Sequence, residues 1–142
     1  MAKVANTHNI VEDGKYKSLA LPNGAATTNS DGIQIHDGDA QFLIPHEVEI
    51  IAPALATSPL PDTKTMKYSL QQSSDDGVAD AYATIPGCEN IITQTGAGGA
   101  GAAAQTERVR LPADVEKYIR LSAVNSGAGD ASGSSATVSF MV

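Results

Sequence analysis

Short runs of alternating apolar and polar residues recur along this 142-residue chain. In the run from Tyr118 to Val124, Ile119, Leu121 and Ala123 alternate with more polar residues. A period of two is typical of a strand with one buried face. Similar short runs lie at residues 33–35, 41–44, 47–51, 66–71, 91–92, 108–111 and 136–142. No stretch has the pattern of a long helix. The sequence therefore predicts seven or eight short strands and an all-β fold, a small jelly-roll-like β-sandwich.

The segments between these runs are rich in small residues. Residues 96–104 are only Gly and Ala, and residues 125–135 are mainly Gly, Ser and Ala. Because such a composition buries little apolar surface, we expect long Gly/Ala/Ser-rich loops, the first of them mobile or ordered by a partner. Gly96, Gly98 and Gly101 match the spacing of a dinucleotide-binding loop. A strand-like run follows them where that motif needs a helix, so we expect no cofactor.

The chain has the length of one domain. Its first part is rich in turn-forming Gly, Asn and Asp, as in NGAATTNSDG. We therefore expect an N-terminal arm or loop region over residues 1–39, either free or packed on the domain. The β-sandwich domain is expected over residues 40–142.

The chain is acidic, with sixteen Asp and Glu residues against nine Lys and Arg residues and a formal net charge of −7. No Lys or Arg lies between Ser18 and Thr63. Solubility explains this acidity, and a sharper alternative is a surface that must stay clear of a polyanion. Because no basic face with interleaved aromatic residues is visible, direct nucleic-acid binding is not expected. No apolar run approaches the roughly 18 residues of a membrane-spanning helix, so no membrane partner is expected either.

The cysteine content and the first residues bear on where the chain is made. Cys88 is the single cysteine, which excludes an internal disulfide framework. The stretch MAKVANTHNIVEDGKYKS lacks the apolar core of a signal peptide. We therefore expect synthesis in a reducing cytoplasm.

One cluster has residues that could bind a metal ion. His36, Asp37 and Asp39 lie together in IHDGDA, and carboxylates two residues apart around a glycine could ligate Ca²⁺ through oxygen. The full calcium-loop pattern is missing, and turns stabilised by Asp side chains explain the same residues. We therefore expect no metal site here. A second acidic group is expected to form a hairpin or loop tip and consists of Asp75, Asp76 and Asp80.

Other residues with catalytic potential lack partners in the sequence. The histidines, His8, His36 and His46, have no metal-ligand spacing with one another or with Cys88. No local signature supplies Cys88 with a base. We therefore expect that the protein is not an enzyme and carries no metal or other cofactor.

The C-terminal block ERVRLPADVEKYIRLSAVNSGAGDASGSSATVSFMV resembles the end of small capsid cement, or decoration, proteins of tailed bacteriophages. The strand VRLP, the polar turn ADVEK, the strand opening on YIRL, the Gly/Ser-rich loop and the last apolar strand carry this resemblance, together with KYSLQQSSDDGVADAY upstream. It covers roughly residues 40–142.

The resemblance implies a structural function in the virion. Such proteins are small jelly-roll or sandwich domains that bind the outer surface of an icosahedral head, often as dimers or trimers. They hold neighbouring major capsid protein subunits together and have no catalytic residues. The implied partners are therefore the major capsid protein and further copies of this chain, after synthesis in the host cytoplasm.

The Pro-rich connector is the candidate contact segment. Pro-rich extended chains lose little entropy on docking, so we expect the N-terminal arm and residues 53–62 to form part of the contact between subunits or with the capsid. Its candidate interface residues are Pro53, Leu55, Pro59, Leu60 and Pro61.

Two other functions stay open at this point. A receptor-binding or tail-associated β module would favour a carbohydrate-binding face with exposed aromatic residues, and the chain offers four Tyr, two Phe and no Trp. A small cupin-like metal enzyme would need two or three His and a Glu that converge on one ion.

Overall fold

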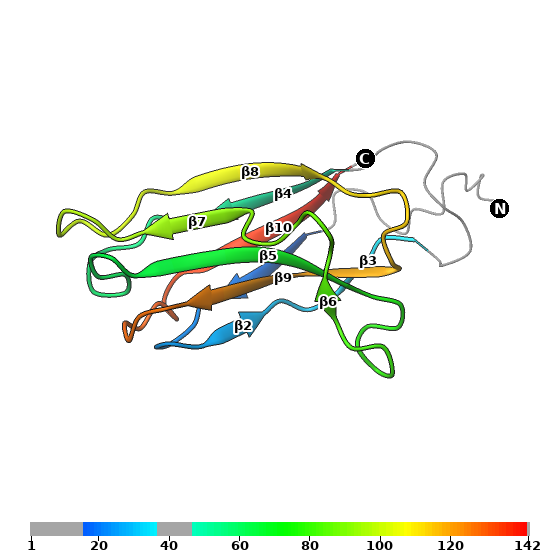
Figure 1. Cartoon of the computed structure of the whole chain (residues 1–142), viewed down its shortest axis with the longest axis horizontal. Helices are drawn as coiled ribbons and strands as arrows, with labels where there is room; N and C mark the ends of the chain where they lie inside the picture. Colours follow the sequence, from blue (N-terminus) through cyan, green and yellow to red (C-terminus); the bar gives the residue numbers. More distant parts are fainter. Residues whose placement is uncertain (1–15, 37–46, 142) are drawn as a thin grey trace.

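The computed structural model describes residues 16–36 and 47–141 and shows two antiparallel sheets packed face to face (Figure 1). The described residues form no helix. One sheet contains β1 (Tyr16–Ala20), β10 (Ser135–Met141), β4 (Glu47–Ala52) and β8 (Gln105–Arg110), in that order. The other contains β2 (Thr27–Asn29), β3 (Ile33–Gln34), β9 (Tyr118–Asn125), β5 (Thr65–Ser73), β6 (Ala83–Thr84) and β7 (Ile92–Thr95). The predicted all-β sandwich is confirmed.

The order of the strands is that of a jelly roll. In the second sheet β2 and β3 both pair with β9, and β6 and β7 both pair with β5. Each of these pairs of short strands therefore occupies one strand position, which leaves four positions per sheet. The chain changes sheet at most of its connections, as it does in the two Greek keys of a jelly roll.

The core lies between the two sheets and follows the predicted alternation. Ile119, Leu121 and Ala123 of β9 are fully buried, and Leu121 lies opposite Leu70 of β5. β9 is a central strand, because β2 and β3 flank it on one side and β5 on the other. Apolar residues of β4 and β10 close the core from the other sheet and include Val48, Ile50, Ala136, Val138 and Phe140.

The domain boundary predicted at residue 40 is wrong. β1, β2 and β3 all precede it, and β1 pairs with β10 from Tyr16 opposite Ser139 to Ala20 opposite Ser135. The pattern could not show this because β1 is an edge strand in which only Leu19 is buried. The sandwich therefore includes residues 16–36. The rest of the predicted arm and the run at residues 41–44 lie outside the described residues.

Candidate protein interface

Four connections meet at one end of the sandwich (Figure 1). They are residues 21–26, 53–64, 96–104 and 126–134, and we call them together the loop end. Backbone hydrogen bonds join them: the amide of Gly24 donates to the carbonyl of Gly129 (2.9 Å), and that of Thr63 donates to the carbonyl of Gly96 (2.9 Å). The two pairs of loops also pack on each other, because a Cβ atom on Gly129 would overlap the carbonyl oxygens of Ser58 and Pro59. The loop end is thus one connected surface built from four distant parts of the sequence.

The Pro-rich connector and the Gly/Ala loop lie side by side. The pairing of β4 with β8 runs as far as Ala52 opposite Gln105, and it resumes in the same register with Leu55 opposite Ala102. Leu55 and Ala102 exchange two backbone hydrogen bonds, of 2.9 and 2.8 Å. Pro53 interrupts the pairing because proline has no amide proton. Both segments are therefore extensions of one strand pair.

A buried glutamine side chain supplies hydrogen bonds where the pairing of the two backbones is interrupted. The side-chain amide of Gln94, which is fully buried, donates to the carbonyls of Pro53 (2.7 Å) and Ala103 (2.9 Å). Its carbonyl accepts the hydroxyl proton of buried Tyr68 at 2.8 Å. Burial raises the pKa of this tyrosine, which keeps its proton for the hydrogen bond. Gln94 therefore satisfies the carbonyl groups of Pro53 and Ala103, which have no strand partner at this interruption. No sequence pattern indicated this role for Gln94.

The Gly/Ala loop packs on the connector, which differs from the mobile surface loop that its composition suggested. Gly96 and Gly101 are buried. A Cβ atom on Gly96 would overlap the carbonyl oxygen of Pro61, and one on Gly101 would overlap that of Leu55. The absence of side chains here permits two backbones to approach closely, rather than providing flexibility.

Two of the predicted interface residues are in the wrong place for a contact with a partner. Leu55 is 2% exposed and Leu60 is 0% exposed, so both belong to the chain's own core. The sequence showed them as the large apolar residues of a Pro-rich segment, but not that the segment is folded against the sandwich. Pro53, Pro59 and Pro61 are half-buried.

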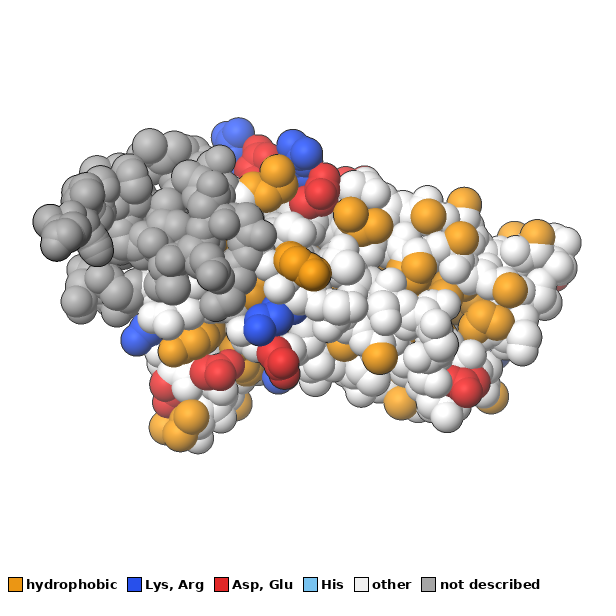
Figure 2. Space-filling model, turned by 180° about the vertical axis from the view of Figure 1, so that it is seen from behind, with side chains coloured by type: hydrophobic (Ala, Val, Ile, Leu, Met, Phe, Trp, Pro, Cys, Tyr) orange, Lys and Arg blue, Asp and Glu red, His pale blue; other side chains and the backbone are white. Residues whose placement is uncertain are grey.

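The surface of the loop end is built from small side chains. A shallow open depression is lined by residues 54–56 from the connector and 100–103 from the Gly/Ala loop. The charged residues of the four loops are Asp62, Lys64 and Asp130. Figure 2 shows this end as white and orange with little red or blue, whereas charged groups gather nearer the other end. A surface of this kind can bind a protein through shape and backbone groups with little desolvation of charge.

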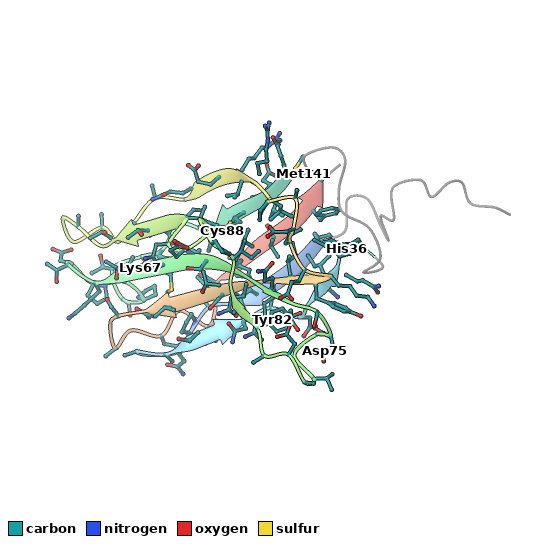
Figure 3. All side chains as sticks on the ribbon, turned by 45° about the vertical axis from the view of Figure 1, so that its right-hand side comes forward. His36, Lys67, Asp75, Tyr82, Cys88 and Met141 are labelled. Atoms are coloured by element: carbon teal, nitrogen blue, oxygen red, sulfur yellow. The ribbon has the colours of Figure 1, made fainter. Side chains whose placement is uncertain are left out.

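The cluster that was considered as a calcium site, His36, Asp37 and Asp39, is described only at His36. This side chain is buried, and its Nε2 lies 3.0 Å from the carbonyl oxygen of Val115 (Figure 3). Asp37 and Asp39 lie outside the described residues, as do His8 and His46. Within residues 16–36 and 47–141, no group of three or more His, Cys, Asp or Glu side chains could hold a metal ion. Those same stretches contain no helix long and apolar enough to cross a membrane.

Cys88 is a buried thiol. It is 2% exposed and follows β6 in the connection to β7 (Figure 3). Burial, and secondly the charge of Glu89, raise the pKa of the thiol above its ordinary value. Because the thiolate is the nucleophilic form, this environment makes Cys88 less reactive.

Asp75, Asp76 and Asp80 lie in the connection from β5 to β6, which is the predicted loop tip. The carboxylate of Asp75 accepts the amide protons of Ala79 (2.8 Å), Asp80 (3.1 Å) and Val78 (3.1 Å). These hydrogen bonds, with the amide of Ala79 as the largest cause, lower the pKa of Asp75 below its ordinary value. The loop is therefore organised around a charged carboxylate.

We expect Asp75→Asn to lower the melting temperature in a pH-dependent way. Since the folded-state pKa is lowered, the carboxylate stabilises the fold above its unfolded pKa, and this contribution is lost as the pH falls through the folded pKa. The difference between wild type and variant in thermal unfolding followed by circular dichroism should be full near neutral pH and should shrink as the pH falls through the lowered pKa of Asp75.

Glu116 titrates in a separate window. Burial, and then the neighbouring Asp80, raise the pKa of Glu116. The stability that its protonated form contributes is therefore lost as the pH rises through that raised value. This change lies above the ordinary pKa of a carboxyl group, whereas that of Asp75 lies below it. A constant difference between wild type and Asp75→Asn at all pH values would contradict the assigned role of the Asp75 charge.

No family model matches the chain, and no curated protein matches it. Among solved structures, PirA is 14% identical over 93% of this chain and 99% of that chain, with a TM-score of 0.42. A CBM4 structure is 17% identical over 88% of this chain and 66% of that chain, with a TM-score of 0.37. A chain of infectious bursal disease virus, Gt strain, is 16% identical over 93% of this chain and 29% of that chain, also with a TM-score of 0.37. At these TM-scores the similarities support no inference about function.

Proposed function

We propose that this chain is a capsid cement protein, which binds the outer surface of an icosahedral bacteriophage head and stabilises contacts between subunits of the major capsid protein. The observation that carries the proposal is the loop end, where four connections, hydrogen-bonded in two pairs and packed together, form one surface with few charges. The resemblance of residues 107–142 to the end of phage cement proteins supports the same function.

The loop end has the properties that a repeated, modest contact needs. Its backbones are already joined, as by the bonds between Leu55 and Ala102, so little conformational entropy is lost on binding. Its small side chains allow a close approach of another backbone. A weak contact gains strength when the symmetry of the shell repeats it and when the bound protein is itself an oligomer.

A second surface fits self-association as a dimer or trimer. Tyr16 is 63% exposed and Ile51 is 41% exposed. Both lie on the outer face of the β1-β10-β4-β8 sheet, on the two sides of β10. Between them this face carries the small residues Thr137 and Ser139 of β10. Exposed apolar side chains on a sheet face are a suitable centre for a contact between copies.

The proposal predicts that charge placed on the loop end abolishes capsid binding. Ala56→Glu and Ala100→Glu each add a carboxylate at an exposed position of the depression, where burial against a partner would leave it unpaired. We expect at least about a tenfold loss of affinity for purified capsids of the encoding phage, measured by co-sedimentation.

Ala113→Glu is the matched control, because Ala113 is exposed in the connection from β8 to β9 at the other end of the sandwich. All three variants should keep the melting temperature of the wild type. If the wild-type protein does not sediment with capsids, the proposed function is wrong. If wild type binds and the loop-end variants bind equally well, the function stands and the assignment of the surface is wrong.

A further inference from the structure

The connection from β5 to β6 projects from the sandwich away from the loop end (Figure 1). Val78 lies within it and is 85% exposed, more than any other large apolar side chain among residues 16–36 and 47–141. A single exposed valine is ordinary in a folded protein. What distinguishes this one is the hydrogen-bonded loop that holds it.

The loop is fixed by two side chains at its base. Asp75 accepts the amide protons of Val78, Ala79 and Asp80, as described above. The hydroxyl of Ser73, which is 0% exposed, donates to the carbonyl of Asp80 (2.6 Å) and accepts the amide proton of Gly77 (2.8 Å). The backbone on both sides of Val78 is therefore held by charged or buried acceptors.

The loop is also attached to the sandwich. The hydroxyl of Tyr82 donates to a carboxylate oxygen of Asp76 at 2.6 Å. The guanidinium of Arg120 stacks over the Tyr82 ring at 4.1 Å from its centroid, and its Nε donates to the side-chain carbonyl of Gln71 at 2.7 Å. Figure 3 shows Asp75 and Tyr82 close together at this end of the molecule. The loop is thus anchored to β5 and β9.

We propose that Val78 is the apolar tip of a second docking element, which inserts into a shallow apolar pocket bordered by Lys or Arg side chains on the capsid surface. This inference rests on the proposed function. A β-branched side chain on a fixed backbone loses little entropy on binding. The loop and the turn beside it are acidic, which fits a basic border on the partner; their carboxylates are those of Asp75, Asp76, Asp80 and Glu116.

A second docking element at the other end explains how one small domain connects neighbouring subunits. The loop end and the Val78 loop lie at opposite ends of the sandwich (Figure 1). Two contacts separated in this way can reach two capsid subunits, and each raises the effective concentration of the other. Loss of either contact should therefore weaken binding strongly without preventing the fold.

Co-sedimentation with purified capsids of the encoding phage tests the inference, with Val78→Asp and Val78→Ile as variants. We expect Val78→Asp to bind at least about tenfold more weakly and Val78→Ile to bind within about twofold of wild type. Ala113→Glu is again the control, because Ala113 is exposed in the connection from β8 to β9, away from the loop end, and it should bind as wild type does. Melting temperatures should be unchanged, since all three variants change exposed side chains.

The outcomes separate this inference from the proposed function. If wild type binds capsids and Val78→Asp binds within twofold of it, the second docking element is wrong while the capsid function stands. Equal losses in Val78→Asp and Ala113→Glu would also overturn it, because the effect would then be one of charge alone. If wild type does not bind capsids, both proposals are wrong.

Discussion

Leu121→Ala is expected to lower the free energy of unfolding by about 2–5 kcal/mol, which is the usual range for a buried leucine in a core that cannot collapse around the cavity. Leu121 is 0% exposed at the middle of β9, opposite Leu70 of β5. Both faces of the cavity would be held by sheets, so little relaxation is available. Urea unfolding followed by circular dichroism measures the change.

Val124→Ala is the matched control for this substitution. Val124 lies on the same strand, three residues further along, but it is 44% exposed. We expect it to change the free energy of unfolding by less than about 0.5 kcal/mol. A loss below that value for Leu121→Ala itself would contradict the position of β9 in the centre of the core.

The strands with strict alternation could be predicted from the sequence because a sheet with one buried face imposes a period of two. The runs at 47–51, 66–71 and 118–124 became β4, β5 and β9. Their apolar residues are the buried ones, with few exceptions such as Ile51, which is 41% exposed. The fold class followed from these runs and from the lack of a helical pattern.

The edge strands could not be predicted in the same way. β2 has three residues and β3 has two, and β2 contains no apolar residue at all. Such strands form because β9 offers free hydrogen-bonding groups, which is a property of the assembled sheet and not of the short segment. This is also why the boundary at residue 40 was wrong.

The candidate interface could be predicted as a segment but not as a surface. The proline spacing indicated an extended connector, and the connector is indeed part of the loop end. The sequence could not show that residues 96–104 pair with it, because the pairing is through backbone groups and leaves no side-chain pattern. For the same reason the sequence predicts Leu55 and Leu60 as contacts for a partner, although both are buried.

The glycines of the Gly/Ala loop differ in a way that permits a second strong prediction. Gly101 has a φ of 71° and backbone atoms of Leu55 directly beside it, so it combines an unfavourable conformation for other residues with a close approach. Gly99 has a φ of 66° but open space around it. Gly96 has the close approach, to Pro61, without a positive φ. Gly133, which lies outside this loop in the connection from β9 to β10, has neither.

Substitution of each of these four glycines by alanine should therefore give a graded series. We expect Gly101→Ala to lower the free energy of unfolding by about 2–5 kcal/mol, because the strain of a positive φ adds to overlap with a fixed backbone. Gly96→Ala should cost about 1–3 kcal/mol through overlap alone, and Gly99→Ala about 1–2 kcal/mol through φ alone. Gly133→Ala is the control and should be neutral within about 0.5 kcal/mol or slightly stabilising. Urea unfolding of the four variants decides between two descriptions of the loop: four equally small effects would mean a mobile loop without packing, whereas the graded series means that residues 96–104 are a folded part of the loop end.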